Sequence, residues 1–127
     1  MIQRRALVAE DSLLVLIALE MLLIQHGIDI VGPASTVDEA MELAQTGMPE
    51  IAILDVNLHG EMIFPVADFL IGRGVPVILT TGYSARDFLP PRLIDLPTIR
   101  KPYEPADLME MVERAFACAD GELADCR

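Results

Sequence analysis

Short apolar runs alternate along the chain with longer stretches in which apolar residues recur at helical spacing. The short runs are rich in β-branched residues and often apolar at consecutive positions, which is typical of parallel strands buried on both faces. Such strands are predicted at 6–9, 28–31, 51–54, 75–79 and, more weakly, 98–99. Helices are predicted between and after them, at 12–26, 37–45, 65–72 and 105–118.

Local signals support the starts of two of these helices. Thr36 and Glu39 have the spacing of a capping box, in which the glutamate side chain reaches back to the cap residue. Glu104 and Pro105 are typical of an acidic cap followed by proline in the first turn.

The alternation predicts an α/β fold of the (βα)₅ type, with a doubly wound, five-stranded parallel sheet and helices on both faces. The fourth helix is expected to be short or irregular, with at most one turn before Pro90, because Pro90 and Pro91 interrupt 84–96. The 127 residues suit one domain, which we expect at 3–119, followed by a short C-terminal tail at 120–127. Ligands of such sheets bind outside the carboxyl ends of the strands.

Composition narrows the function classes. With 53% hydrophobic residues the chain is not intrinsically disordered, and its net charge of −11 argues against a nucleic-acid partner. The apolar run at 13–24 contains Glu20 and is too short to span a membrane. Cys118 and Cys126 lack metal-ligand spacing and are predicted to be free thiols in a reducing compartment. We therefore expect a soluble, cytoplasmic protein.

Polar and charged side chains follow four of the five predicted strands. Since the carboxyl ends of parallel strands share one edge, three carboxylates, a hydroxyl and an ammonium are expected to converge there. Ionised carboxylates packed together need a cation, and an all-oxygen site suits Mg²⁺. Each residue alone could be a helix cap or a turn former, but their coincidence at four strand ends favours a site. The residues are Glu10-Asp11, Asp55-Val56-Asn57, Thr80-Thr81-Gly82 and Arg100-Lys101-Pro102, Lys101 being the only lysine.

Four motifs, in this order and at these intervals, give the chain a specific family resemblance. They are Val8-Ala9-Glu10-Asp11, Ile53-Leu54-Asp55-Val56-Asn57, Leu79-Thr80-Thr81-Gly82-Tyr83 and Lys101-Pro102-Tyr103. Over residues 4 to about 119 the chain resembles the receiver domains of two-component response regulators. The resemblance implies the flavodoxin-like receiver fold.

The resemblance also implies a role for each strand-end residue. Asp55 would accept a phosphoryl group from a sensor histidine kinase or a histidine phosphotransfer protein. Thr81 would hydrogen-bond a phosphoryl oxygen, and Lys101 would pair with Asp55 or its phosphoryl group. Mg²⁺ would be bound by Asp11, Asp55 and the backbone carbonyl of Asn57, with Glu10 acting through a water. The domain would catalyse only its own phosphorylation and dephosphorylation.

Two features depart from the commonest receiver pattern. Thr98 stands three positions before Lys101, where many receivers carry an aromatic switch residue. The Thr81-Gly82-Tyr83 junction resembles a group of single-domain receivers with a Phe-Ala-Thr-Gly motif, and 82–96 is expected to be mobile until Thr81 meets the phosphoryl group. No output module is recognised, so signalling is expected to pass by protein–protein contact or onward phosphotransfer.

Three alternative functions are weighed on the same residues. A pseudo-receiver binding module would have lost part of the set Asp11, Asp55, Thr81 and Lys101. A phosphatase of the haloacid dehalogenase type needs a second aspartate where Asn57 stands. A flavodoxin-like nucleotide-binding domain needs a glycine-rich loop directly after the first strand, which the sequence lacks there.

The first helix has more apolar residues than one buried face requires. Spacing at 100° per residue assigns one side of it to the core and leaves Leu13, Ile17 and Ile24 on the opposite side. These are either scattered surface residues or part of a homodimer or partner interface. The residues assigned to the core are Leu14, Val15, Ala18, Leu19 and Leu22.

Overall fold

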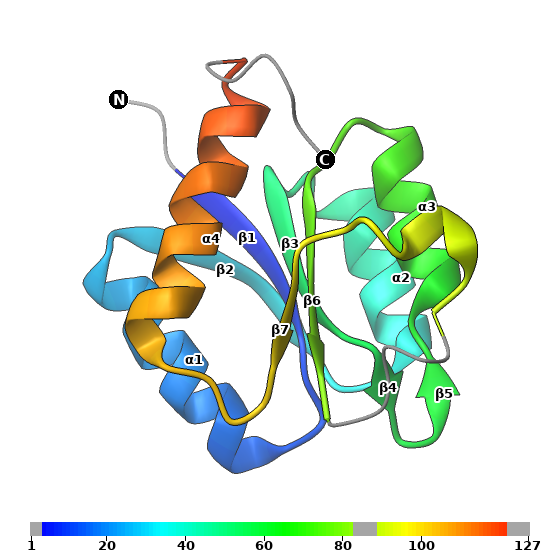
Figure 1. Cartoon of the computed structure of the whole chain (residues 1–127), viewed down its shortest axis with the longest axis horizontal. Helices are drawn as coiled ribbons and strands as arrows, with labels where there is room; N and C mark the ends of the chain where they lie inside the picture. The colour runs from blue at the N-terminus through cyan, green and yellow to red at the C-terminus, as the bar shows by residue number, and fades with distance from the viewer. Residues whose placement is uncertain (1–3, 83–88, 122–127) are drawn as a thin grey trace.

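A five-stranded parallel sheet forms the centre of the molecule (Figure 1), in a computed structural model that describes residues 4–82 and 89–121. The strand order is β2-β1-β3-β6-β7, and every neighbouring pair is parallel. This order confirms the doubly wound, flavodoxin-like α/β fold. The strands are β1 (Arg4–Ala9), β2 (Ile28–Ala34), β3 (Ile51–Asp55), β6 (Val77–Thr81) and β7 (Thr98–Arg100).

Among the described residues, two helices pack on each face of the sheet (Figure 1). Helices α1 (Leu13–Gln25) and α4 (Pro105–Ala119) pack on one face, and α2 (Val37–Thr46) and α3 (Phe64–Gly72) pack on the other. Alternate residues of β1, β3 and β6 enter the two cores, so that these strands are apolar at consecutive positions, as predicted. Among the described residues, no helix is long and apolar enough to cross a membrane.

The helix ends follow the predicted chemistry only in part. The Thr36 hydroxyl accepts a hydrogen bond from the Glu39 N–H at 3.1 Å, as a cap residue should. The Glu39 carboxylate, however, accepts from the N–H and hydroxyl of Ser35, both at 3.0 Å, and not from the cap residue itself. Pro105 lies in the first turn of α4 as predicted, but the Glu104 side chain makes no capping hydrogen bond.

The buried face of α1 differs from the one the sequence predicts. Leu19 and Leu23 are buried, whereas Leu14, assigned to the core, is 81% exposed. Ala18 is exposed as well. The helix is apolar on nearly every side, so its sequence contains no polar stripe that would fix which side faces the sheet.

Three short elements of the structure were not predicted from the sequence. Strands β4 (Asn57–Leu58) and β5 (Glu61–Met62) form an antiparallel hairpin after β3, and a 3₁₀ turn, η2, spans Pro91–Leu93. The helical turn predicted before Pro90, and much of the segment predicted to be mobile, lie outside the described residues.

Cys118 is disulfide-bonded, so the prediction of a free thiol there is wrong, and cysteine usage gives no support for a reducing compartment. Spacing rules identify metal motifs and cysteine-rich scaffolds, and they do not detect an isolated pair.

Candidate functional site

An acidic cluster lies at the carboxyl end of the sheet, where the strand order reverses between β1 and β3. Glu10 and Asp11 directly follow β1, and Asp55 is the last residue of β3. One carboxylate oxygen from each of the three lies within 4.8 Å of the other two. Parallel pairing of β1 with β3 therefore brings Glu10 and Asp11 next to Asp55, which lies 45 and 44 positions further along the sequence, as the strand-end pattern predicted.

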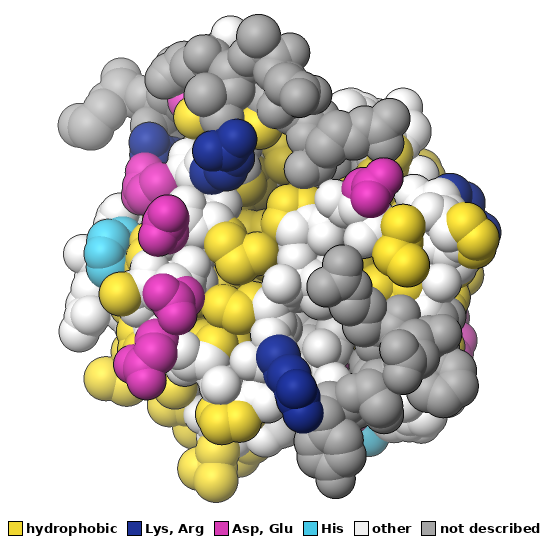
Figure 2. All heavy atoms as spheres, viewed as in Figure 1, with side chains coloured by type: hydrophobic (Ala, Val, Ile, Leu, Met, Phe, Trp, Pro, Cys, Tyr) yellow, Lys and Arg dark blue, Asp and Glu magenta, His cyan; other side chains and the backbone are white. Residues whose placement is uncertain are grey.

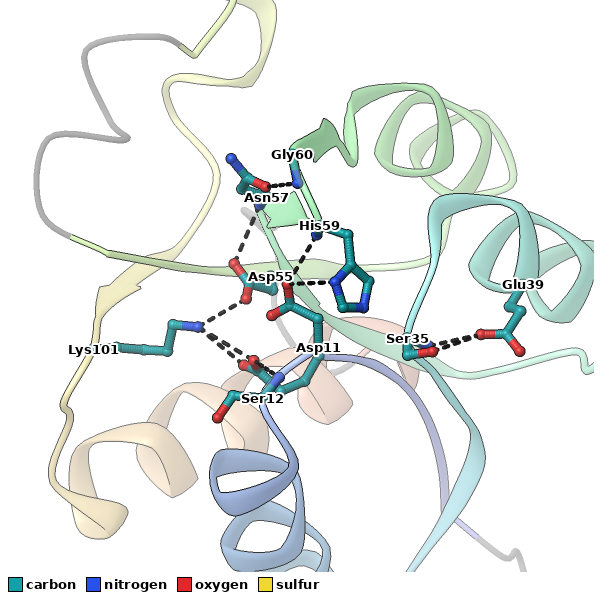
Figure 3. A network of polar contacts seen from close by, with 10 residues as sticks. Asp11, Ser12, Ser35, Glu39, Asp55, Asn57, His59, Gly60 and Lys101 are labelled. Carbon is teal, nitrogen blue, oxygen red and sulfur yellow. Dashed lines mark hydrogen bonds and ion pairs between the residues drawn. The ribbon is translucent and has the colours of Figure 1, made fainter.

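Lys101 reaches this cluster from the end of β7 (Figure 3). Its Nζ donates to Asp55 Oδ2 at 2.8 Å and to the two oxygens of Glu10 at 3.2 and 3.4 Å. The Lys101 backbone N–H donates to the carbonyl of Thr81 at 2.7 Å, so the lysine is fixed to the end of β6 as well. The amine thus lies between two of the three carboxylates.

Burial makes these charges interact strongly. Glu10 and Asp55 are only 3% and 4% exposed. Burial raises the pKa of Glu10, and the charge of Asp55 adds to this effect against the opposing hydrogen bonds from Ser12 and Lys101. Burial alone would lower the pKa of Lys101, but its hydrogen bond to Asp55 and the two carboxylate charges outweigh burial and raise it. Lys101 is therefore held as a cation.

Asp11 and Asp55 each accept a backbone hydrogen bond from the segment after β3 (Figure 3). The His59 N–H donates to Asp11 Oδ2 at 2.9 Å, and the Asn57 N–H donates to Asp55 Oδ1 at 3.2 Å. The His59 ring also lies near, with Nδ1 3.8 Å from the same Asp11 oxygen. The sequence indicates a surface residue and no ligand at His59, which has no partner at metal-binding spacing; its side chain is 62% exposed, but the contact of its backbone N–H with Asp11 was not predicted.

Of the remaining predicted residues, Thr81 lies at the same edge, whereas Thr98 lies further back in the sheet, in register with Leu79. Thr81 is buried at the end of β6, and its neighbour Thr80 is in register with Asp55. Thr98 lies at the start of β7, where its hydroxyl donates to the carbonyl of Leu96 at 3.0 Å. A separate cavity of about 710 Å³ lies near the opposite end of the sheet, between the end of α3, the residues before β7, and α4, and contains none of the cluster.

The donor set fits a hard divalent cation. Three carboxylates of one sign share one edge, and Lys101 offsets only part of their charge. Carboxylate and carbonyl oxygens are the ligands that Mg²⁺ takes in proteins, usually with several waters retained. The cluster can therefore hold a metal ion beside Asp55.

Comparison with known proteins gives receiver-domain regulators. SdrG from Sphingomonas melonis Fr1 is 35% identical, with a TM-score of 0.75 over 91% of this chain and 95% of SdrG. A CheY-like response regulator receiver domain from Methanospirillum hungatei JF-1 shares the fold with a TM-score of 0.83 at 21% identity, over 96% of this chain and all of that one. No family model matches the chain.

Two curated regulators match the chain over part of their own length. The transcriptional regulatory protein PdtaR of Mycobacterium tuberculosis is 32% identical over 97% of this chain, which spans 64% of PdtaR. The phyllosphere-induced regulator PhyR of Methylorubrum extorquens is 30% identical over 87% of this chain, which spans 42% of PhyR.

Proposed function

Because the chain belongs to the receiver family of two-component response regulators, we propose that it accepts a phosphoryl group on Asp55 from a phosphohistidine donor. The donor is a sensor histidine kinase or a histidine phosphotransfer protein. The observation that carries this proposal is the Lys101 amine, which lies between Asp55 and Glu10 and next to a carboxylate cluster that fits a divalent cation.

In the proposed reaction a carboxylate oxygen of Asp55 attacks the phosphorus of the donor. The new O–P bond forms as the N–P bond of the phosphohistidine breaks, and the electron pair returns to the imidazole. Charge on the phosphoryl oxygens has to be stabilised during the transfer. In the proposal Lys101 pairs with one of these oxygens, and the hydroxyl of Thr81 donates a hydrogen bond to another.

The proposed metal ligands are Asp11, Asp55 and the backbone carbonyl of Asn57, with Glu10 acting through a water. When bound, Mg²⁺ supplies positive charge to the phosphoryl oxygens. The protein's own contribution is to keep the carboxylates close together at an edge that is already ordered, because β1, β3 and β6 are hydrogen-bonded neighbours.

The first helix is the proposed docking surface for the donor. Five large apolar side chains on α1 are between 45% and 81% exposed. Hydrophobic side chains gather at the lower left of Figure 2, where Figure 1 places α1. Four of them, Leu14, Ile17, Met21 and Ile24, are spaced three, four and three residues apart, as along the contact line between two paired helices. The five are Leu13, Leu14, Ile17, Met21 and Ile24.

The size and position of this face favour a brief encounter over a stable homodimer. A helix of 13 residues is about 20 Å long, which is short for a standard interface of about 800 Å² per partner. The helix begins two residues after Asp11, so a partner helix lying on it would bring its own side chains to the acidic cluster. The homodimer suggested by the sequence is the weaker of the two interpretations.

A phosphodonor assay tests the proposed acceptor. With Mg²⁺ and a small-molecule phosphodonor, intact-mass analysis is expected to show one added phosphoryl group in the wild type and in Asp29→Asn, an exposed control on β2. Asp55→Asn is expected to stay unlabelled, and chelation of the metal is expected to abolish labelling. Wild-type protein that binds Mg²⁺ but accepts no phosphoryl group would instead be a binding module.

The docking surface is tested separately. Ile17→Glu is expected to slow phosphotransfer from the cognate kinase while leaving labelling by the small phosphodonor unchanged. Ile71→Glu places the same charge on an exposed apolar position of α3 and is the matched control. Equal transfer to both variants contradicts docking on α1.

A further inference from the structure

The β4–β5 hairpin has a tightly defined turn. Leu58 pairs with Glu61, which leaves His59 and Gly60 as the two central residues. Both have positive φ, 51° and 88°, as a type I′ turn requires. The Gly60 N–H donates to Asn57 Oδ1 at 2.7 Å, closing the turn from the side chain as well.

The same hairpin is fixed to the body of the protein on both sides of the turn. The Val56 N–H donates to the carbonyl of Thr80, and the Ile63 N–H donates to the carbonyl of Val56, both at 2.9 Å. Leu58 is 1% exposed and packs in the core beneath α2 and α3. The turn is therefore held in one place relative to β3.

The tip of this turn contacts the acidic cluster through its backbone. The left-handed conformation of His59 directs its N–H to Asp11 Oδ2, as Figure 3 shows. The first residue of the hairpin, Asn57, donates its N–H to Asp55. One hairpin thus contacts carboxylates at the carboxyl ends of two different strands, β1 and β3.

We infer that the β4–β5 hairpin positions Asp11 for the metal: the His59 N–H holds one carboxylate oxygen and turns the other toward the ion. This inference rests on the proposed function, since it concerns the metal site beside Asp55. Partners that hydrogen-bond a ligating carboxylate fix its orientation and strengthen metal binding. His59 and Gly60 are accordingly positioning residues, and the backbone of His59, not its ring, performs the role.

Gly60→Ala is a clean perturbation of the turn. A Cβ at Gly60 would meet no heavy atom within 4 Å, so the substitution strains the left-handed backbone without a steric clash. Gly74→Ala is the matched control, because Gly74 also has a positive φ, 78°, and no neighbour within 4 Å. Gly74 lies after α3 at the amino end of β6, away from the cluster.

The experiment measures the Mg²⁺ dissociation constant by calorimetry and the free energy of unfolding by urea for each full-length variant. Gly60→Ala is expected to bind Mg²⁺ about tenfold more weakly than wild type. Gly74→Ala is expected to lose similar stability and keep wild-type affinity. His59→Gly keeps the N–H and relieves the strain, so its affinity is expected to stay within about twofold of wild type.

Two outcomes would contradict the inference. If Gly60→Ala and Gly74→Ala bind Mg²⁺ equally well, or if His59→Gly loses affinity as Gly60→Ala does, the positioning role of the hairpin backbone is wrong. In both cases the wild type still binds Mg²⁺, and the proposed function stands. Wild-type protein that binds no Mg²⁺ overturns the proposed function and this inference together.

Discussion

Replacing Lys101 by methionine tests whether its amine stabilises the folded protein by compensating the negative charge of the acidic cluster. The side chain is 21% exposed, and the side chains of its partners Glu10 and Asp55 are 3% and 6% exposed. Removing one partner of a buried ion pair costs about 3–5 kcal/mol, because the other charge is left buried without compensation. The partial exposure of Lys101, and uptake of a proton by Glu10 with its raised pKa, place the loss near the lower end, at about 3 kcal/mol.

The assay is urea and thermal unfolding in the presence of a chelator and again with millimolar Mg²⁺. In chelator, Lys101→Met is expected to melt about 10 °C below wild type. Mg²⁺ is expected to recover part of this loss and to stabilise the variant more than the wild type, because the uncompensated charge is larger. Adding Glu10→Gln is expected to restore stability, since one carboxylate is then removed together with the amine.

Two results would refute the reasoning. The first is a Lys101→Met protein as stable as wild type in chelator, which would mean that the contacts of 2.8 and 3.2 Å contribute nothing net. The second is an equal rise of the melting temperature on addition of Mg²⁺ in the wild type and in Lys101→Met. Asp68→Asn, which removes an ion pair with 41% and 59% exposed side chains, is the surface control and is expected to lose much less.

Further predictions follow from other contacts. Mg²⁺ is expected to raise the melting temperature of wild type and to raise that of Asp11→Asn much less, because one ligand is weakened; equal shifts would place the ion elsewhere. A hydrogen bond from Arg92 holds the pKa of Asp68 below its usual 3.8, so the stability difference between wild type and Asp68→Asn is expected to be constant from pH 8 to about 5 and to shrink as the pH falls below 3.8. Phe116→Ala is expected to cost about 3–5 kcal/mol in urea unfolding, since Phe116 is fully buried between α4 and the sheet; a loss under 1 kcal/mol would contradict that packing.

The strand ends were the most predictable part of the site. Runs that are apolar on both faces indicate parallel strands, and parallel strands bring their carboxyl ends to one edge. Asp11, Asp55 and Lys101 could therefore be placed together from their positions alone. The structure adds which carboxylate oxygen accepts a hydrogen bond from which donor.

The features that the sequence did not predict depend on local geometry. The hairpin strands are two residues each, too short for a periodic pattern, so the contact of His59 with Asp11 was missed. The orientation of α1 was misassigned at Leu14, because a helix that is apolar on all sides has no polar stripe to define its exposed face. The capping role of Glu39 shifted by one residue to Ser35, a difference decided by side-chain reach.

The position of Lys101 gives the site a built-in chemical reporter. It is the only lysine in the sequence, so the chain has a single side-chain amine. Only an unprotonated amine reacts with acylating reagents, and although burial alone would lower the pKa of Lys101, Asp55 and Glu10 raise it and keep the amine protonated. The acylation rate of this one residue therefore reports how strongly the carboxylates hold the amine. Because a metal ion bound by the same carboxylates would change that rate, mass spectrometry of the acylated protein can follow metal binding without an introduced label.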